Sequence, residues 1–275
     1  MTIGDRIRNT QLFLFDMDGT LYLENELYDF TKELLRVIRE SGRRYLFVTN
    51  NSSKSVKDYI VKLEKLGIAA EYDDFLTSTQ AVAYYLKLHH ADARLYVCGT
   101  ESLKEELRRE GFVVTEDLDK TDCIIMGNDT ERTFQKLYDV SKLLHTRPGI
   151  PYIATNLDYV CPTSFGSVPD CGSMCDMLYN VSKRRPISVG KPSPLMPQLA
   201  MERTGIDAAH TAMVGDRIYT DVKSGLNAGI LAVLVMSGET TKEILEESED
   251  RPDLVLESAA CILSALKNES ANSVN

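Results

Sequence analysis

The chain has 275 residues, which is enough for one large domain or for two domains of moderate size with a substantial core. It contains 31 basic and 41 acidic residues, giving a formal net charge of -10, and no long run of either sign. This balance argues against a basic nucleic-acid-binding face, and no run of about 18 apolar residues indicates a membrane span. The N-terminal residues lack the apolar stretch of a signal peptide, so we expect a cytoplasmic protein without nucleic-acid or membrane partners.

The cysteine pattern indicates a reducing compartment. The six cysteines form no C-x-x-C pair, and the four histidines show no zinc-finger spacing, so we do not expect zinc. Cys171 and Cys175 lie four residues apart and could share a helix face, where buried free cysteines act as small hydrophobic side chains.

Apolar periodicity in the first part of the chain predicts alternating strands and helices. The apolar run 12–15 predicts a buried strand, and the helical spacing over 29–41 predicts a helix that ends at Gly42. Residues 45–48 predict a second strand, and residues 56–66 predict a second helix closed by Gly67. This order is typical of the beginning of a parallel sheet.

A second alternating series follows within residues 81–182, after which the first pattern resumes. The predicted strands of the second series are 95–97, 123–126 and 152–154, and those of the resumed sheet are 187–189, 211–214, 231–235 and 254–256. We therefore predict an α/β protein with a doubly wound, Rossmann-like parallel-sheet core formed by residues 1–80 and 183–275. Residues 81–182 are predicted to form an inserted α/β domain.

Two carboxylates one residue apart follow the first predicted strand. Asp16 and Asp18 belong to the string D-M-D-G-T, at the carboxyl end of a strand, where open α/β sheets bind ligands. The turn at Gly19 allows the second carboxylate to approach whatever the first one holds. One carboxylate could attack while the other moves protons, whereas a strand followed by a simple Asx-turn is the structural alternative.

The end of the second predicted strand carries a hydroxyl and amides. Thr49 and Asn50 precede backbone N–H groups that we expect to open a helix, an arrangement that suits a phosphate. The alternative is an ordinary helix N-cap made by Asn51, Ser52 or Ser53.

Two further strand ends add a cation and more carboxylates. Lys191 follows the predicted strand 187–189, although a single lysine could simply be exposed to solvent. Asp216 and Asp221 follow the predicted strand 211–214, although Asp216 could cap a helix that begins there. Sequential strands are usually neighbours, so these groups together favour one phosphate- and metal-binding site.

These four segments, in this order, resemble the four motifs of the haloacid dehalogenase-like (HAD) hydrolase superfamily. Leu21-Tyr22, the stretch 49–53, Gly190-Lys191-Pro192 and the stretch 215–221 are similar to its NagD-like branch, which carries a large α/β cap after the second motif. The resemblance implies a catalytic HAD core, residues 1–80 and 183–275, and a cap, residues 81–182, that determines substrate specificity. Members are mostly magnesium-dependent phosphatases acting on small phosphate esters.

The resemblance also implies a role for each motif residue. Asp16 would be the nucleophile that forms an aspartyl phosphate, and Asp18 would protonate the leaving alkoxide and then activate water. Mg²⁺ would be held by Asp16, Asp216 and the Asp18 carbonyl, which suits a cation that keeps several waters. The residues expected to bind phosphate are Thr49, Asn50, Asn51 and Lys191, and those expected to support the site are Gly19 and Asp221.

In the predicted cap, the stretch Thr155-Asn156-Leu157-Asp158 matches a T-N-x-D pattern of the family's substrate-facing region. The resemblance implies that Asn156 and Asp158 lie near the leaving group. The following stretch, 169–176, departs from the glycine- and alanine-rich pattern of relatives, so no substrate identity is carried over. Cap surfaces in this branch often pair, which implies a possible homodimer through the cap.

The leading hypothesis is a Mg²⁺-dependent phosphatase that hydrolyses a small organic phosphomonoester such as a sugar phosphate or a nucleoside monophosphate. A phosphotransferase or mutase would use the same aspartyl phosphate, and the motifs do not distinguish it. A haloacid dehalogenase fits less well because Asp18 and Asp216 would have little purpose. A non-catalytic binding module of the same fold is the alternative outside enzymes.

Overall fold

The computed structural model describes residues 2–163 and 165–272, which fold as two compact units. The first unit comprises Met1–Thr49, Ile60–Leu76 and Lys191–Asn275, and the second comprises Asn50–Tyr59 and Thr77–Gly190. The expected insertion, 81–182, lies inside the second unit, which also includes residues on either side of it.

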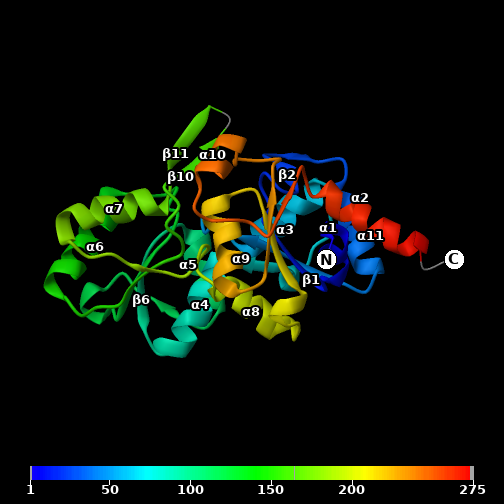
Figure 1. The fold of residues 1–275 in the computed structure, drawn as a ribbon. Helices are drawn as coiled ribbons and strands as arrows, with labels where there is room; N and C mark the ends of the chain where they lie inside the picture. Colours follow the sequence, from blue (N-terminus) through cyan, green and yellow to red (C-terminus); the bar gives the residue numbers. More distant parts are fainter. Residues whose placement is uncertain (1, 164, 273–275) are drawn as a thin grey trace. The chain divides into compact units, whose positions relative to one another are not determined.

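The first unit is built on a six-stranded sheet (Figure 1). The spatial order of its strands is β15 (Leu254–Leu256), β14 (Leu231–Val235), β13 (Thr211–Gly215), β1 (Leu12–Phe15), β4 (Arg44–Thr49) and β5 (Phe75–Thr77). The pairs β1–β4, β1–β13, β13–β14 and β14–β15 are parallel, which confirms the predicted α/β architecture.

The central position of β1 follows from its composition. All four of its residues, Leu12 to Phe15, are buried, as expected for a parallel strand covered on both faces. Each such side chain stabilises the fold by about 1.5–3 kcal/mol relative to exposure. The buried strand therefore holds the residues that follow it in a fixed position.

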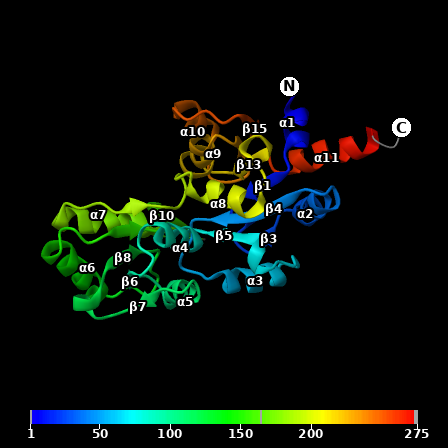
Figure 2. The ribbon, with the colours of Figure 1, turned by 90° about the horizontal axis from the view of Figure 1, so that it is seen from below.

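Helices flank this sheet in two groups (Figure 2). Helices α1 (Ile3–Asn9) and α2 (Thr31–Glu40) pack against α11 (Ala260–Asn272), whereas α8 (Leu195–Thr204) packs against α9 (Lys223–Ala228). The remaining elements of this unit are the hairpin β2 (Tyr22–Leu23) and β3 (Glu26–Leu27), α10 (Lys242–Glu247), the 3-10 turns η1 (Tyr72–Asp74) and η3 (Ala208–His210), and the π-helical turn η4 (Ile218–Val222). Helix α3 (Val56–Lys65) begins in the second unit and continues into the first from Ile60.

The second unit has its own five-stranded parallel sheet. Its strand order is β12 (Ile187–Ser188), β9 (Tyr152–Ala154), β8 (Cys123–Met126), β6 (Arg94–Cys98) and β7 (Val113–Val114). The expectation that the strand near Ile187 resumes the first sheet is wrong, because Ile187 pairs with Ile153 and Ser188 with Ala154. Three of the four motif-bearing strand ends therefore belong to the first sheet, and β12 does not.

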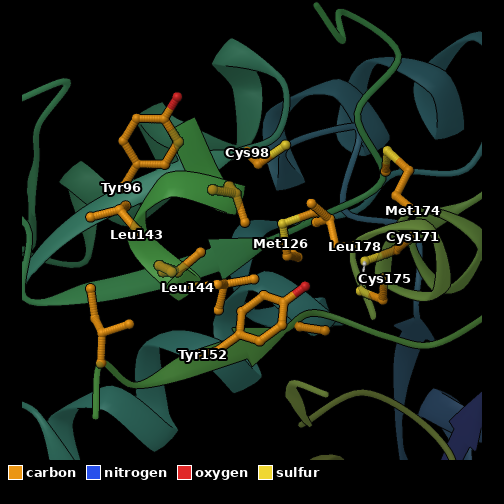
Figure 3. Packing of buried hydrophobic residues seen from close by; sticks show 14 residues of the cluster. Tyr96, Cys98, Met126, Leu143, Leu144, Tyr152, Cys171, Met174, Cys175 and Leu178 are labelled. Carbon is orange, nitrogen blue, oxygen red and sulfur yellow. Dashed lines mark hydrogen bonds between the residues drawn. The ribbon is translucent and has the colours of Figure 1, made fainter. Parts of the chain in front are cut away.

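One hydrophobic cluster of the second unit lies between its sheet and two helices. Side chains of β6, β8 and β9 pack against α6 (Phe134–Thr146) and α7 (Cys171–Ser182), as Figure 3 shows. Cys171 and Cys175 share one face of α7, with their sulfur atoms 4.0 Å apart. All six cysteines are free thiols, and these two are fully buried, which agrees with their predicted role as small hydrophobic side chains.

The other elements of the second unit are helices α4 (Ser78–His89) and α5 (Glu101–Arg109), the 3-10 turn η2 (Leu118–Lys120), and the antiparallel pair β10 (Val160–Thr163) and β11 (Gly166–Pro169). The strands that the sequence did not predict are β2, β3, β5, β7, β10 and β11. None of the described helices combines the length and apolar character needed to cross a membrane.

Candidate active site

The register of the first sheet brings three of the predicted motifs to one edge. Phe15 pairs with Phe47 on β4 and with Val214 on β13, so the chain leaves all three strands at the same level. Asp16 follows Phe15 directly, and its N–H donates to the Val214 carbonyl over 2.8 Å. Thr49 ends β4, and Asp216 follows β13, so the predicted hydroxyl and carboxylates meet at the carboxyl edge of the sheet.

Lys191 brings a buried positive charge to this edge. Its side chain is 2% exposed, and its ammonium donates to Asp16 Oδ1 over 2.5 Å and to Asp221 Oδ1 over 2.6 Å. A third hydrogen bond reaches the Val48 carbonyl over 3.3 Å. Burial acts to lower the pKa of Lys191, but the two carboxylates outweigh it and hold the pKa above its ordinary value. The alternative of a solvent-exposed lysine is therefore wrong.

Asp221 is occupied as a structural partner rather than being available as a ligand. Its Oδ1 accepts from Lys191, and its Oδ2 accepts from the Arg217 backbone N–H over 3.0 Å. The π-helical turn η4 brings Asp221 back toward the strand end, because the Asp221 N–H donates to the Arg217 carbonyl. The predicted supporting residue thus orients Lys191 through a direct ion pair.

Asp216 has one carboxylate oxygen without a partner. Its Oδ2 accepts from the Glu239 N–H over 2.7 Å, whereas its buried Oδ1 has no hydrogen-bond partner in the described part of the chain. Burial raises the pKa of Asp216 to about 6, and the nearby Asp221 carboxylate acts in the same direction. Asp216 does not cap a helix, since η4 begins at Ile218 with Arg217 at its N-cap, and the Asp216 carboxylate accepts from Glu239 instead.

The donor set at this edge fits a divalent cation. Oxygen atoms of Asp16, Asp216 and Asp221 all lie within 4.8 Å of one another. Because Asp221 is engaged on both oxygens, the ligands that remain are the Asp216 Oδ1 and the Asp16 Oδ2, which accepts no hydrogen bond from the described residues. Magnesium takes one or two carboxylates and retains water, which matches this arrangement.

The charge balance supports the same interpretation. Among the described residues, Lys191 pairs with Asp16 and Asp221, and Arg217 pairs with Glu239, whereas Asp216 has no ion pair, so four carboxylates face two cations and negative charge is in excess. Burial raises the pKa of Asp16 to about 8; Lys191 opposes this shift, whereas Asp221 and Asp216 add to it. A divalent cation would remove the excess.

Gly19 permits the close approach of the first motif to Asp216. Its φ of +80° is accessible to glycine, and a Cβ at this position would lie 2.5 Å from Asp216 Oδ2. The turn is held by the Gly19 N–H, which donates to the Tyr22 carbonyl over 2.8 Å. Asp18, immediately before it, is exposed and makes no hydrogen bond to another described residue, so its carboxyl group can reach a ligand.

A fifth strand end contributes residues that the sequence did not single out. The segment after β14 supplies the Glu239 N–H to Asp216, and the Glu239 carboxylate pairs with Arg217 Nε over 2.8 Å. A Cβ on Gly238 would overlap the Asp216 carboxylate. The available signal was a glycine three residues past the predicted strand 231–235, but Ser237-Gly238 is indistinguishable from an ordinary turn by residue type.

Three other predicted residues, Asn50, Asn156 and Asp158, form a cluster within the second unit. Asn50 Nδ2 lies 3.1 and 3.2 Å from the two carboxylate oxygens of Asp158, and Asn156 Nδ2 donates to the Asn50 carbonyl over 2.8 Å. Ser52 and Thr155 join their hydroxyls over 2.9 Å. The structure therefore brings Asn50 together with Asn156 and Asp158, which lie more than 100 residues further along the chain.

The segment after Thr49 does not open a helix, contrary to the prediction. Helix α3 begins at Val56, and Ser55 with Asp58 provides its reciprocal capping bonds. Asn51 instead accepts the Ser53 N–H over 2.9 Å and the Ser53 hydroxyl over 2.7 Å in a local turn. Neither a helix N-terminus facing phosphate nor an N-cap by residues 51–53 is present, because the turn displaces the helix start.

Comparison with known proteins identifies the family. A family model described as haloacid dehalogenase-like hydrolase matches residues 13–113, and a second, described as HAD-hydrolase-like, matches residues 188–261. The chain is 32% identical to the acid sugar phosphatase of Staphylococcus saprophyticus over 246 residues, which is 90% of this chain and 94% of that protein. It has the same identity and coverage with the 5'-nucleotidase YutF of Bacillus subtilis.

Solved structures give the same result for the fold. The 4-nitrophenylphosphatase of Thermotoga maritima matches with a TM-score of 0.89 at 37% identity, covering 95% of this chain and 98% of that one. NagD from Escherichia coli K-12 matches with a TM-score of 0.82 at 28% identity, covering 91% of this chain and 97% of that one. The chain therefore belongs to the haloacid dehalogenase-like hydrolases, in the NagD-like branch of phosphoric monoester hydrolases.

Proposed function

We propose that this protein is a Mg²⁺-dependent phosphatase that hydrolyses a small organic phosphomonoester through an aspartyl-phosphate intermediate. The proposal depends on the buried Lys191 ammonium, which bonds both Asp16 and Asp221. At the same edge, Asp216 Oδ1 has no hydrogen-bond partner among the described residues. Phosphoryl transfer depends mainly on positioning and on neutralising charge, and this edge concentrates the groups for both.

In the proposed reaction, Asp16 attacks phosphorus and Asp18 protonates the leaving alkoxide. Lys191 holds one Asp16 oxygen over 2.5 Å, so the carboxylate is oriented and its ionised form is stabilised before substrate arrives. Asp18 then accepts a proton from the water that hydrolyses the aspartyl phosphate. Its exposure leaves it free to act at both stages.

The bound Mg²⁺ would neutralise charge on the phosphoryl oxygens during transfer. Asp16, Asp216 and the Asp18 carbonyl are the proposed ligands. Asp221 supports the site by fixing Lys191, and Gly19 supports it by allowing the first motif to approach Asp216.

Thr49, Asn50, Asn51 and Lys191 are proposed to bind the phosphate group, and the cap is proposed to choose the organic part. We assign residues 81–182 to this cap, with Asn156 and Asp158 near the leaving group. The direct bonds of Asn50 to Asp158 and Asn156 support this role because they connect the phosphate-binding segment to the T-N-x-D stretch. Sugar phosphates and nucleoside monophosphates are the first candidate substrates, and a homodimer through the cap is a further part of the proposal.

Release of phosphate from p-nitrophenyl phosphate in the presence of Mg²⁺ tests the proposal. We expect activity that EDTA abolishes and that Asp16→Asn eliminates. Normal turnover by Asp16→Asn would overturn the assignment of the nucleophile. A panel of phosphate esters ranked by kcat/KM would then identify the substrate class.

The same panel separates hydrolysis from transfer to a second substrate. Phosphate release is measured beside phosphoryl transfer to added sugar and alcohol acceptors. We expect free phosphate to be the main product. A predominantly phosphorylated acceptor would instead identify a phosphotransferase or mutase that uses the same carboxylate.

A further inference from the structure

A pocket lies in the first unit at the opposite end of β4 from Thr49. Its volume is 310 Å³, and its lining includes Lys32, Leu35 and Arg39 of α2, Tyr45 near the start of β4, and Ile68 after α3. Strand β4 runs from Arg44 to Thr49, and a strand rises about 3.3 Å per residue, so the pocket is roughly 13 Å from the catalytic edge at Tyr45. A ligand here would not occupy the proposed phosphate-binding position.

Lys32 supplies a positive charge to this pocket. Its side chain extends from α2 toward the turn at Gly67, where a Cβ would lie 2.6 Å from the Lys32 ammonium nitrogen. The ammonium makes no hydrogen bond or ion pair with another described residue, and the residue is exposed. Glycine at position 67, with φ of +78°, leaves room for the lysine beside the backbone. An unpaired ammonium at the pocket wall is available to an anion.

Arg39 and Tyr45 supply further donors on a rigid support. The Arg39 guanidinium stacks over the Tyr45 ring, 4.7 Å from its centroid, and Nη2 alone donates to the Asp74 carboxylate, over 2.8 and 2.9 Å. Its other N–H groups make no hydrogen bond within the described residues. Tyr45 is 5% exposed, and its hydroxyl likewise has no hydrogen-bond partner there. Burial raises the pKa of Tyr45 to about 12, so the hydroxyl remains a donor.

The remaining lining residues indicate which kind of organic group the pocket could accept. Leu35 and Ile68 are almost fully buried and present an apolar wall. Arg36 is paired with Glu40 over 2.6 Å, so these two charges largely neutralise each other at the rim. The pocket thus combines an apolar wall with cationic and hydroxyl donors, in a chain whose formal net charge is -10.

We propose that this pocket binds a small organic anion, with its carboxylate or phosphoryl group at Lys32 and Arg39 and its apolar body against Leu35 and Ile68. Helix α2 connects the pocket to the first motif, because the Thr31 hydroxyl, next to Lys32, donates to the Leu21 carbonyl over 2.6 Å. The bound anion is a ligand separate from the hydrolysed ester.

Amide chemical shifts of the full-length protein test the proposal at the residue level. Isotope-labelled protein is titrated with phenylphosphonate, which is not hydrolysed, and in parallel with benzoate, inorganic phosphate and neutral benzamide. We expect saturable shifts at Gly67, Ile68 and Ala69 with phenylphosphonate or benzoate, weaker shifts with inorganic phosphate, and none with benzamide. A response to only one of the two aromatic anions would identify which headgroup the pocket prefers and would support the proposal.

Three variants provide the controls. Lys32→Ala should weaken binding about tenfold, the effect of losing one charge-assisted hydrogen bond. Lys32→Arg should retain binding, and Lys242→Ala, which removes an exposed lysine from α10, should leave it unchanged. Shifts confined to the surroundings of Asp16 and Lys191, equal binding of benzamide, or unchanged affinity in Lys32→Ala would overturn the proposal. These outcomes are independent of whether the protein hydrolyses p-nitrophenyl phosphate.

Discussion

The two clusters of predicted site residues differ in how they hold their polar groups. At the edge of the first sheet, Lys191 is 2% exposed and lies between the carboxylates of Asp16 and Asp221. These ion pairs compensate the buried charges of all three side chains. In the second unit, the neutral amide of Asn50 faces the Asp158 carboxylate, and the amide of Asn156 bonds the Asn50 carbonyl and the Asp158 backbone N–H. Both clusters are buried, but only the first depends on balancing several charges.

This difference determines how each cluster should respond to substitution. Removing one member of a buried ion pair leaves the other uncompensated, which costs far more than losing a neutral hydrogen bond. The first cluster should therefore be intolerant of change in both chemistry and stability. The second cluster should tolerate conservative substitutions, which should mainly change the substrate preference of the enzyme.

The largest expected effect is on catalysis at Asp16. Asp16→Asn should lower kcat for p-nitrophenyl phosphate by about 10⁴-fold or more, because the amide cannot serve as the nucleophile. Asp158→Asn is the matched change in the second unit and should retain kcat within about tenfold. Steady-state kinetics under saturating Mg²⁺ measures both, and equal losses in the two variants would break the comparison.

Lys191→Met should produce the largest loss of stability. It removes the cation from two buried carboxylates, which should lower the free energy of unfolding by about 3–5 kcal/mol. Urea denaturation measures the change, with Lys242→Ala as an exposed-lysine control expected within about 0.5 kcal/mol of the parent protein. A loss below about 1 kcal/mol for Lys191→Met would show that the ion pairs are not essential to this edge.

Magnesium should stabilise the first cluster selectively. At a concentration of about 100 times its Kd, a cation that binds only the folded state stabilises it by about 2.7 kcal/mol. The melting temperature should rise with Mg²⁺ and return with EDTA. Asp216→Asn should lose the rise, and Asp158→Asn should keep it. A rise that persists in Asp216→Asn would place the cation elsewhere.

The smallest effect is expected for the stability of Asp158→Asn. The new amide retains one acceptor oxygen for Asn50, so the free energy of unfolding should fall by only about 1 kcal/mol. The variant should instead change the ranking of phosphate esters by kcat/KM. A large loss of stability with an unchanged ranking would assign Asp158 to the core rather than to specificity.

The sequence allowed prediction of those site residues that directly follow the predicted strands of the first sheet. Asp16 and Asp216 come after β1 and β13, whose buried residues identify them as strands, and parallel strands share a carboxyl edge. Glu239 could not be found in this way, because its contribution to Asp216 is a backbone N–H that any residue type carries. The strand at Ile187 was assigned to the wrong sheet, since the sequence of a strand with only two paired residues does not indicate which strand lies beside it.

By itself, the amino-acid sequence determined the α/β alternation, the D-M-D-G-T motif and the inventory of carboxylates, lysine and hydroxyl at successive chain positions. These features are local and depend on periodicity and residue type. Only the tertiary structure decided that Asp221 uses both oxygens on Lys191 and Arg217, and that an Asp216 oxygen remains without a described partner. Residues from distant strand ends become hydrogen-bond partners only through tertiary packing, and the spacing of residues along the chain does not specify that packing.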